Sequence, residues 1–151
     1  MSVLTCASGS SCWRGLEYYK QNKVLQIKKI SDIEFKGVVS GAKEYEVYLN
    51  LKNPRKSTCN CPLANGKMIM CKHIIATYFK AVPGSAKAFE DEQNRLEKEY
   101  DEYQENEYQN VIKFINKMTK KELIDELVQI FDYAPEWVYV DFVRRNDIDG
   151  N

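Results

Sequence analysis

The strongest constraint on this chain is a group of three cysteines and the only histidine, all within residues 59–73. Cys59 and Cys61 are separated by one residue, nine residues follow, and Cys71 and His73 are again separated by one residue. Free cysteine often packs as a small apolar side chain, but it rarely occurs in pairs whose spacing suits metal ligands. The pattern therefore indicates a metal site and limits how the middle of the chain can fold.

Zinc suits these residue types because it prefers four sulfur or nitrogen ligands arranged as a tetrahedron. Residues i and i+2 of an extended or tightly turned segment point to the same side, so each closely spaced pair can supply two ligands. The connection between the pairs contains Asn65-Gly66, which favours a turn. We predict one structural Zn²⁺ ion, with no open coordination position, bound by Cys59, Cys61, Cys71 and His73.

Three other interpretations of the cluster stay open from the sequence. The four side chains could belong to a reduced core without metal. A [4Fe–4S] centre normally takes four cysteines, which would require Cys6 or Cys12 in place of His73. A nucleophilic Cys71 with His73 as its base would need a third, orienting group, and the chain shows neither a second histidine nor an oxyanion loop. We rank zinc first and predict no catalytic residue.

The motif resembles the SWIM-type zinc finger, whose pattern is C-x-C, a variable spacer and C-x-H. Pro62 after the second cysteine and Ile74 after the histidine also agree with that family. Upstream, Trp13-Arg14-Gly15, Tyr18-Tyr19, Val39-Ser40-Gly41 and Tyr45-x-Val47 resemble bacterial members, so the resemblance covers roughly residues 14–80. It implies a small sheet followed by a zinc-stapled ββα-like finger, with a role in DNA binding or protein–protein contact.

Hydrophobic patterning predicts an α+β fold. β-Branched content and apolar–polar alternation predict a small antiparallel sheet with strands at residues 23–30, 32–39 and 44–51. We expect helices at residues 13–21 and 74–81, after a polar arm at residues 2–11.

Val82-Pro83-Gly84-Ser85 marks the point where the mixed pattern ends and a helical one begins. We expect an acidic helix from residue 86 to about 108, a more apolar stretch to residue 118, a helix opened by a capping box at Thr119 and Glu122, and a last helix after Pro135. We predict a SWIM-type zinc-binding domain at residues 12–82 and a helical C-terminal extension at residues 86–145.

The net charge of zero hides a strong asymmetry along the chain. Residues 1–85 hold 13 Lys and Arg against 5 Asp and Glu, a net charge of +8, whereas residues 86–151 carry −8. A basic region of this size is sufficient for contact with phosphates. The candidate nucleic-acid contacts close to the metal motif are Lys52, Arg55, Lys56, Lys67 and Lys72.

These patterns predict a zinc-binding module that acts in DNA or RNA binding and has no catalysis of its own. A protein–protein interaction adaptor with a purely structural zinc is the alternative. We expect no small-molecule substrate. We also expect no membrane partner, because no apolar run approaches the roughly 20 residues of a membrane-spanning helix. The start of the chain lacks the features of a secretory signal, so we predict a cytoplasmic location.

Overall fold

The computed structural model describes residues 2–148 and contains two compact units, one ending at Arg95 and the other beginning at Leu96. The first unit combines a four-stranded antiparallel sheet with helices, and the second is helical. The predicted α+β fold is therefore confirmed. The predicted domain limits, 12–82 and 86–145, stay predictions.

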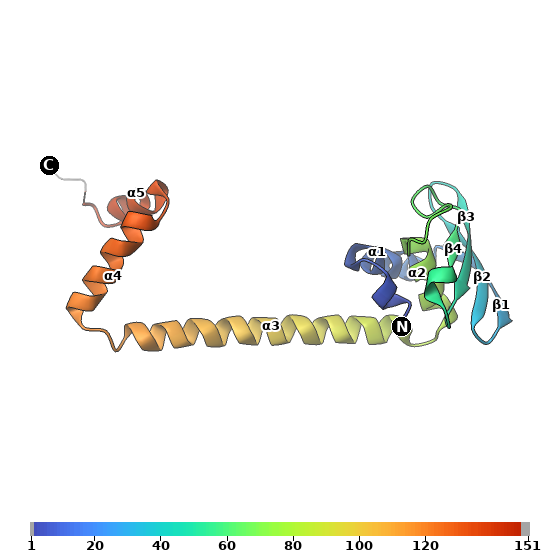
Figure 1. The fold of residues 1–151 in the computed structure, drawn as a ribbon, viewed down its shortest axis with the longest axis horizontal. Coiled ribbons are helices and arrows are strands. Elements are labelled where there is room, and N and C mark those ends of the chain that lie inside the picture. The colour runs from blue at the N-terminus through green and yellow to red at the C-terminus, as the bar shows by residue number, and fades with distance from the viewer. Residues whose placement is uncertain (1, 149–151) are drawn as a thin grey trace. The chain divides into compact units, whose positions relative to one another are not determined.

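The sheet is a meander in which each strand pairs with the next one along the chain (Figure 1). Its strands are β1 (Val24–Ser31), β2 (Glu34–Ser40), β3 (Glu44–Asn50) and the two-residue β4 (Thr58–Cys59), which follows a short 3₁₀ turn at Pro54–Lys56. The first three agree with the predicted strands to within two residues at each end. On β3 the alternation expected of a half-buried strand is present, since Tyr45, Val47 and Leu49 are buried.

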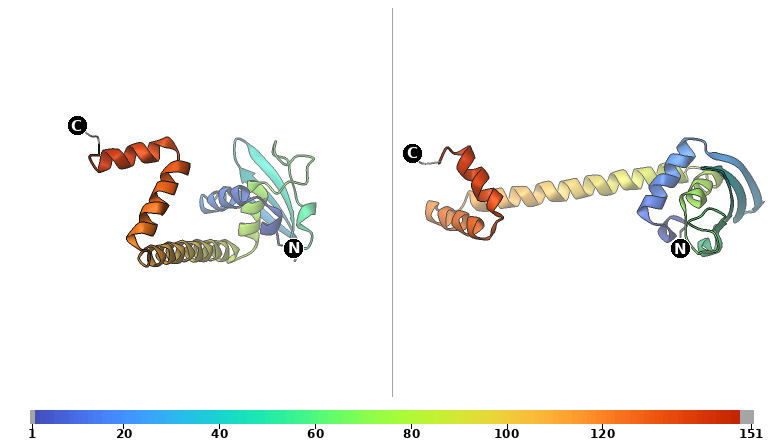
Figure 2. Two further views of the ribbon diagram at one scale, coloured as in Figure 1. Left: turned by 60° about the vertical axis from the view of Figure 1, so that its left-hand side comes forward. Right: turned by 90° about the horizontal axis from the view of Figure 1, so that it is seen from above.

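Helix α2 (Lys72–Ala81) is the centre of the first unit, and it lies between α1 (Gly9–Lys20) and the sheet (Figure 2). Six of its ten residues are buried, as expected for a helix covered on more than one side. Two glycines permit this close approach. A Cβ atom on Gly15 of α1 would lie 2.5 Å from Ile75 Cγ2, and one on Gly37 of β2 would lie 3.0 Å from Thr77 Cγ2.

The expectation of a polar arm before residue 12 is wrong. Leu4–Cys6 form a 3₁₀ turn, and the Ser8 hydroxyl caps α1 by accepting a hydrogen bond from the Ser11 amide. Val3 is only 2% exposed, and Ala7 forms a β-bridge with Met70. The apolar pair Val3-Leu4 is too short to produce a periodic signal, so the burial of Val3 was not visible in the sequence.

The C-terminal part is helical, as predicted, with α3 (Ser85–Ile115), α4 (Lys120–Tyr133) and α5 (Glu136–Arg145). No break occurs near residue 108, because α3 continues through the more apolar stretch. Thr119 and Glu122 form the predicted capping box at the start of α4. Helices α4 and α5 meet at Phe131, whose ring centroid lies 4.9 Å from that of Phe142. Neither helix has a buried residue.

We predict that Gly15→Ala destabilises the zinc-loaded protein. Alanine in a helix interior normally gains about 0.5–1 kcal/mol over glycine, but here the added methyl group meets Ile75, and overpacking costs about 1–3 kcal/mol. Urea unfolding measures the change. Gly9→Ala in the same helix is the matched control, because its Cβ atom would have nothing within 4 Å. If Gly15→Ala proves as stable as Gly9→Ala, the approach of α1 to α2 is not tight.

Candidate metal centre

The fold gathers the four predicted ligands around the start of α2. Cys59 ends β4, Cys61 lies in the turn that follows, Cys71 is the N-cap residue of α2, and His73 is in the first turn of that helix. All four side chains are buried, with exposed fractions between 1% and 4%. Their ligand atoms lie within 4.8 Å of one another, so one ion can reach all of them.

The donor spacing agrees with a single zinc ion. Zinc–sulfur and zinc–nitrogen bonds of about 2.3 and 2.0–2.1 Å at a tetrahedral angle place the two donors about 3.6 Å apart. The Nδ1 atom of His73 lies 3.7 Å from Cys59 Sγ and 3.8 Å from Cys71 Sγ. Three thiolates and one imidazole complete the preferred coordination number, so the set fits one structural Zn²⁺ with no position left for water.

Backbone hydrogen bonds shape the turn that holds the first pair of cysteines. The Cys61 carbonyl accepts from the amides of Ala64 and Asn65, at 3.0 and 2.9 Å, which curls the chain directly after the second cysteine. On the sheet side, Asn60 is tied to Glu46 of β3. The Glu46 amide donates to the Asn60 side chain at 3.0 Å, and the Asn60 amide donates to the Glu46 carbonyl at 3.2 Å. These bonds fix the direction in which Cys59 and Cys61 point.

The pKa values of the Cys59 and Cys71 thiols are shifted in opposite directions. A hydrogen bond between the Cys59 and Cys71 side chains, together with burial, raises the pKa of Cys59 well above its usual range. The same bond lowers the pKa of Cys71 to about 4, helped by His73 and by the backbone amide of Ile74 near the N-terminus of α2. The positive end of a helix favours a thiolate in this way. The cluster is thus poised to present anionic sulfur to a cation.

The ring of His73 is held by aromatic contacts. Tyr45 of β3 stacks on it, with ring centroids 4.5 Å apart and an interplanar angle of 25°, and Tyr18 of α1 approaches it edge-on at 5.5 Å. These contacts leave Nδ1 facing the sulfurs, whereas the buried Nε2 atom has no hydrogen-bond partner among the described residues. Gly41 provides space for this arrangement, because a Cβ atom there would lie 2.8 Å from the Tyr45 ring.

The remaining cysteines lie outside the cluster. Cys6 is half-buried, and the buried Cys12 thiol donates to the Leu4 carbonyl at 3.8 Å. Only three cysteines in the described residues are therefore available here as ligands of a [4Fe–4S] centre. Its four ligands bind four different iron atoms, which requires wider spacing than donors within 4.8 Å of one another provide. A nucleophilic Cys71 would have to react from a side chain that is 1% exposed.

Residues 45–81 match the family model of the SWIM zinc finger. The chain is similar to the SWIM zinc finger over this segment. The segment runs from Tyr45 on β3 to the last residue of α2, so it contains the four candidate ligands and the tyrosine that stacks on His73. Among curated proteins and solved structures, none matches the chain. No helix within residues 2–148 is long and apolar enough to cross a membrane.

The five predicted nucleic-acid contacts lie in three parts of the first unit: the connection between β3 and β4, the loop before α2, and the start of α2. Lys52 and Lys56 line one shallow hollow beside Asn50, whereas Arg55 lines another with Cys6 and Met68. Lys67 is exposed in the loop before α2. Lys72 is half-buried, and its ammonium group lies 4.2 Å from the centroid of the Tyr18 ring, as a cation–π contact. Lys52 and Lys56 thus share a hollow, and Arg55 belongs to the same 3₁₀ turn as Lys56.

Tyr18, Gly41 and Tyr45 match residues of family members, but the sequence alone indicates no role for them. Their function depends on contacts between α1, the β2–β3 turn and α2, which are distant in sequence. The nearest signal was their occurrence in a metal-binding family, because local patterning identifies Tyr45 only as a buried strand residue.

We predict that Cys71→Ser abolishes zinc binding and unfolds the first unit. Zinc contributes about 10–16 kcal/mol to small structural sites, which is as large as the whole net stability of a typical domain, about 5–15 kcal/mol. Native mass spectrometry should find one zinc per wild-type chain and none after chelation, and the cooperative thermal transition of the first unit should disappear with the metal. Acidification acts in the same direction, because protons compete for the thiolates.

Cys6→Ser is the control for this experiment, because its thiol lies outside the cluster. It should keep one zinc per chain. Full zinc occupancy in Cys71→Ser, or loss of zinc in Cys6→Ser, would contradict the assigned ligand set.

Proposed function

We propose that this protein is a nucleic-acid-binding module, in which Cys59, Cys61, Cys71 and His73 hold a structural zinc and the surrounding basic surface contacts phosphates. The observation that carries the proposal is positive charge without neutralising partners. Of the 13 Lys and Arg residues before residue 86, the described structure pairs only two with carboxylates, Lys20 with Glu90 and Lys29 with Asp32. Unneutralised cations on one unit attract a polyanion.

The zinc in this proposal has a positioning role. With four protein ligands it offers no site for a substrate, so its contribution is to fold the finger and fix α2. The thiolates and the metal together carry a formal charge of about −1, which Lys72 at the start of α2 offsets locally. We also infer a cytoplasmic location, since three cysteines in a zinc–thiolate site and two further cysteines without a disulfide among the described residues suit a reducing compartment.

We predict that the full chain binds DNA or RNA with an affinity that falls steeply as salt rises. Fluorescence anisotropy with labelled single-stranded and duplex oligonucleotides over a series of salt concentrations measures the slope. Lys52→Gln combined with Lys56→Gln should reduce the slope by about one per lost phosphate contact. The control with equal charge change is Lys113→Gln combined with Lys117→Gln, outside the first unit. Absence of binding to every oligonucleotide at low salt would end the proposal.

A second candidate function, protein binding, is favoured by the exposed apolar residues of α4 and α5. On α4, Ile124 and Val128 are 51% and 52% exposed, and on α5 Trp137 is 69% exposed. Apolar surface of this extent on a small helical unit is typical of an interaction site.

If the chain binds a protein, we predict that one specific partner co-purifies with it after nuclease treatment. Mass spectrometry identifies that partner. Val128→Glu, which places a charge in the apolar surface, should lose that partner. Gln129→Glu on the same helix adds the same charge beside it and should retain the partner. Equal recovery with both variants would argue against an interface on α4.

A further inference from the structure

The face of the sheet opposite α2 is uncovered, and one register row crosses it completely. Lys28 of β1 lies opposite Lys36 of β2, Lys36 lies opposite Tyr48 of β3, and Tyr48 lies opposite Thr58 of β4. We call these four residues the outer row. Because residues paired across a sheet share a face, the row alternates with the buried row of Gly37, Val47 and Cys59.

Two lysines placed directly opposite each other do not help the sheet to fold. Like charges in this position are destabilising, and neither Lys28 nor Lys36 has an ion-pair partner in the part of the chain that the structure describes. Both side chains are exposed. A negatively charged ligand lying across the row would relieve this repulsion.

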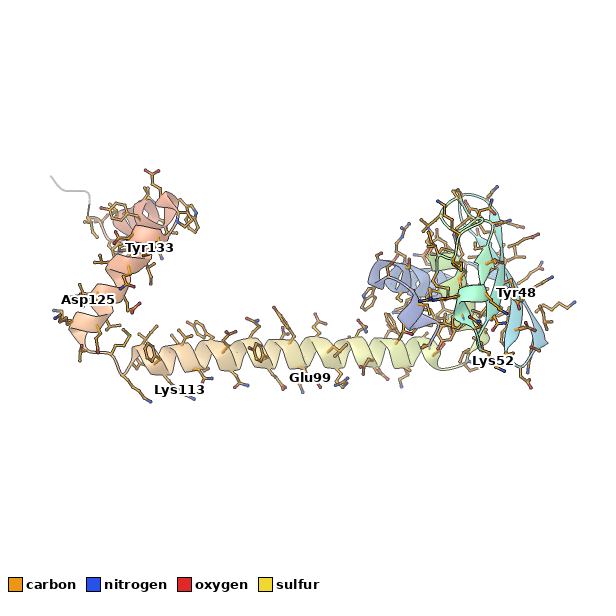
Figure 3. The ribbon with its side chains drawn as sticks, in the orientation of Figure 1. Tyr48, Lys52, Glu99, Lys113, Asp125 and Tyr133 are labelled. Atoms are coloured by element: carbon orange, nitrogen blue, oxygen red, sulfur yellow. The ribbon has the colours of Figure 1, made fainter. Side chains whose placement is uncertain are left out.

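The third member of the row is an aromatic ring in a fixed position. The Tyr48 hydroxyl and the Glu34 carboxylate are hydrogen-bonded, and the Asn50 amide donates to both of them at 3.3 Å. This network anchors one end of the ring next to Lys36. Figure 3 labels Tyr48 on the sheet. An anchored ring loses little conformational entropy when a second flat group stacks on it.

The outer row borders a hollow of about 630 Å³, which is within the range of about 300–1,000 Å³ typical of ligand sites. Its other polar side chains are amides and one carboxylate, supplied by Gln26, Glu46, Asn60 and Asn65. Amides and a carboxylate match the donors and acceptors on base edges. Among the residues that line the hollow, the two lysines outweigh Glu46, and the Glu34 carboxylate beside it is occupied by the Tyr48 hydroxyl and the Asn50 amide. The lining therefore favours an anion that also carries polar ring edges.

We propose that single-stranded nucleic acid binds across this face, with phosphates at Lys28 and Lys36 and a base stacked on Tyr48. The inference rests on the proposed nucleic-acid function and specifies its site and its strand type. A single strand fits because its bases are free to turn toward an aromatic ring. A duplex keeps its bases stacked on one another and would use only the lysines.

The test is fluorescence anisotropy of the full, zinc-loaded chain with a labelled oligothymidine of about 12 nucleotides, within the usual site size of such surfaces, and with a duplex of equal length. Tyr48→Leu should weaken single-strand binding by about 10-fold through lost stacking and leave duplex binding unchanged. Tyr48→Phe, which keeps the ring, should retain most of the affinity. Lys28→Gln combined with Lys36→Gln should reduce the salt slope by about 0.7 for each contact.

The matched control is Lys80→Gln combined with Lys87→Gln, on α2 and α3, which has the same charge change away from the outer row. Every variant should keep one zinc per chain and a folded first unit at the assay temperature, so that altered binding reports the surface. If Tyr48→Leu and the double lysine variant both bind the single strand as tightly as the wild type, this inference is overturned but the proposed function is not. Absence of binding to any nucleic acid overturns both.

Discussion

The first unit depends on the convergence of four donor atoms at the N-terminus of α2. Around them the chain has little other means of holding its shape, because β4 has two residues and the connection from Pro62 to Met70 contains no regular helix or strand. Closing such a loop costs conformational entropy. One ion bonded to both ends of it supplies the compensating free energy and sets where α2 begins. The contacts of α2 with α1 and with the sheet follow from that position.

The ring of the ligand His73 is oriented in an unusual way. A metal-bound imidazole commonly donates its second N–H group to a carboxylate or carbonyl, which fixes the ring. Here the buried Nε2 atom of His73 has no such partner in the described residues, and the stacked ring of Tyr45 takes over the orienting role. Because Tyr45 is on β3 and Gly41 is in the preceding turn, the metal centre is coupled to the β2–β3 hairpin. A structural change in that hairpin would therefore move His73 through its contact with the Tyr45 ring.

The ligand set could be predicted from the sequence because each pair of ligands is local. The spacing of Cys59 and Cys61, and of Cys71 and His73, determines which side chains can point together whatever the rest of the fold does. The strands and the Thr119 capping box were predictable for the same reason. Contacts between distant segments were not, as shown by the buried Val3, the bridge from Ala7 to Met70, and the ring stacked on His73. The continuation of α3 past residue 108 reflects helix propensity without a stop signal such as glycine or proline.

The positions of the lysines also depend on contacts between distant segments that local sequence does not reveal. The sequence reveals a basic region, and the lysines nearest the metal motif in sequence were the natural candidates for phosphate contacts. The strand register instead places Lys28 beside Lys36, which are eight positions apart in the chain, with Tyr48 next in line. Sheet stability disfavours this pair of lysines, and the metal centre makes no use of it. Neither the fold nor the zinc requires this unfavourable pair, and the anionic ligand that we propose for this face would remove the repulsion between the two lysines.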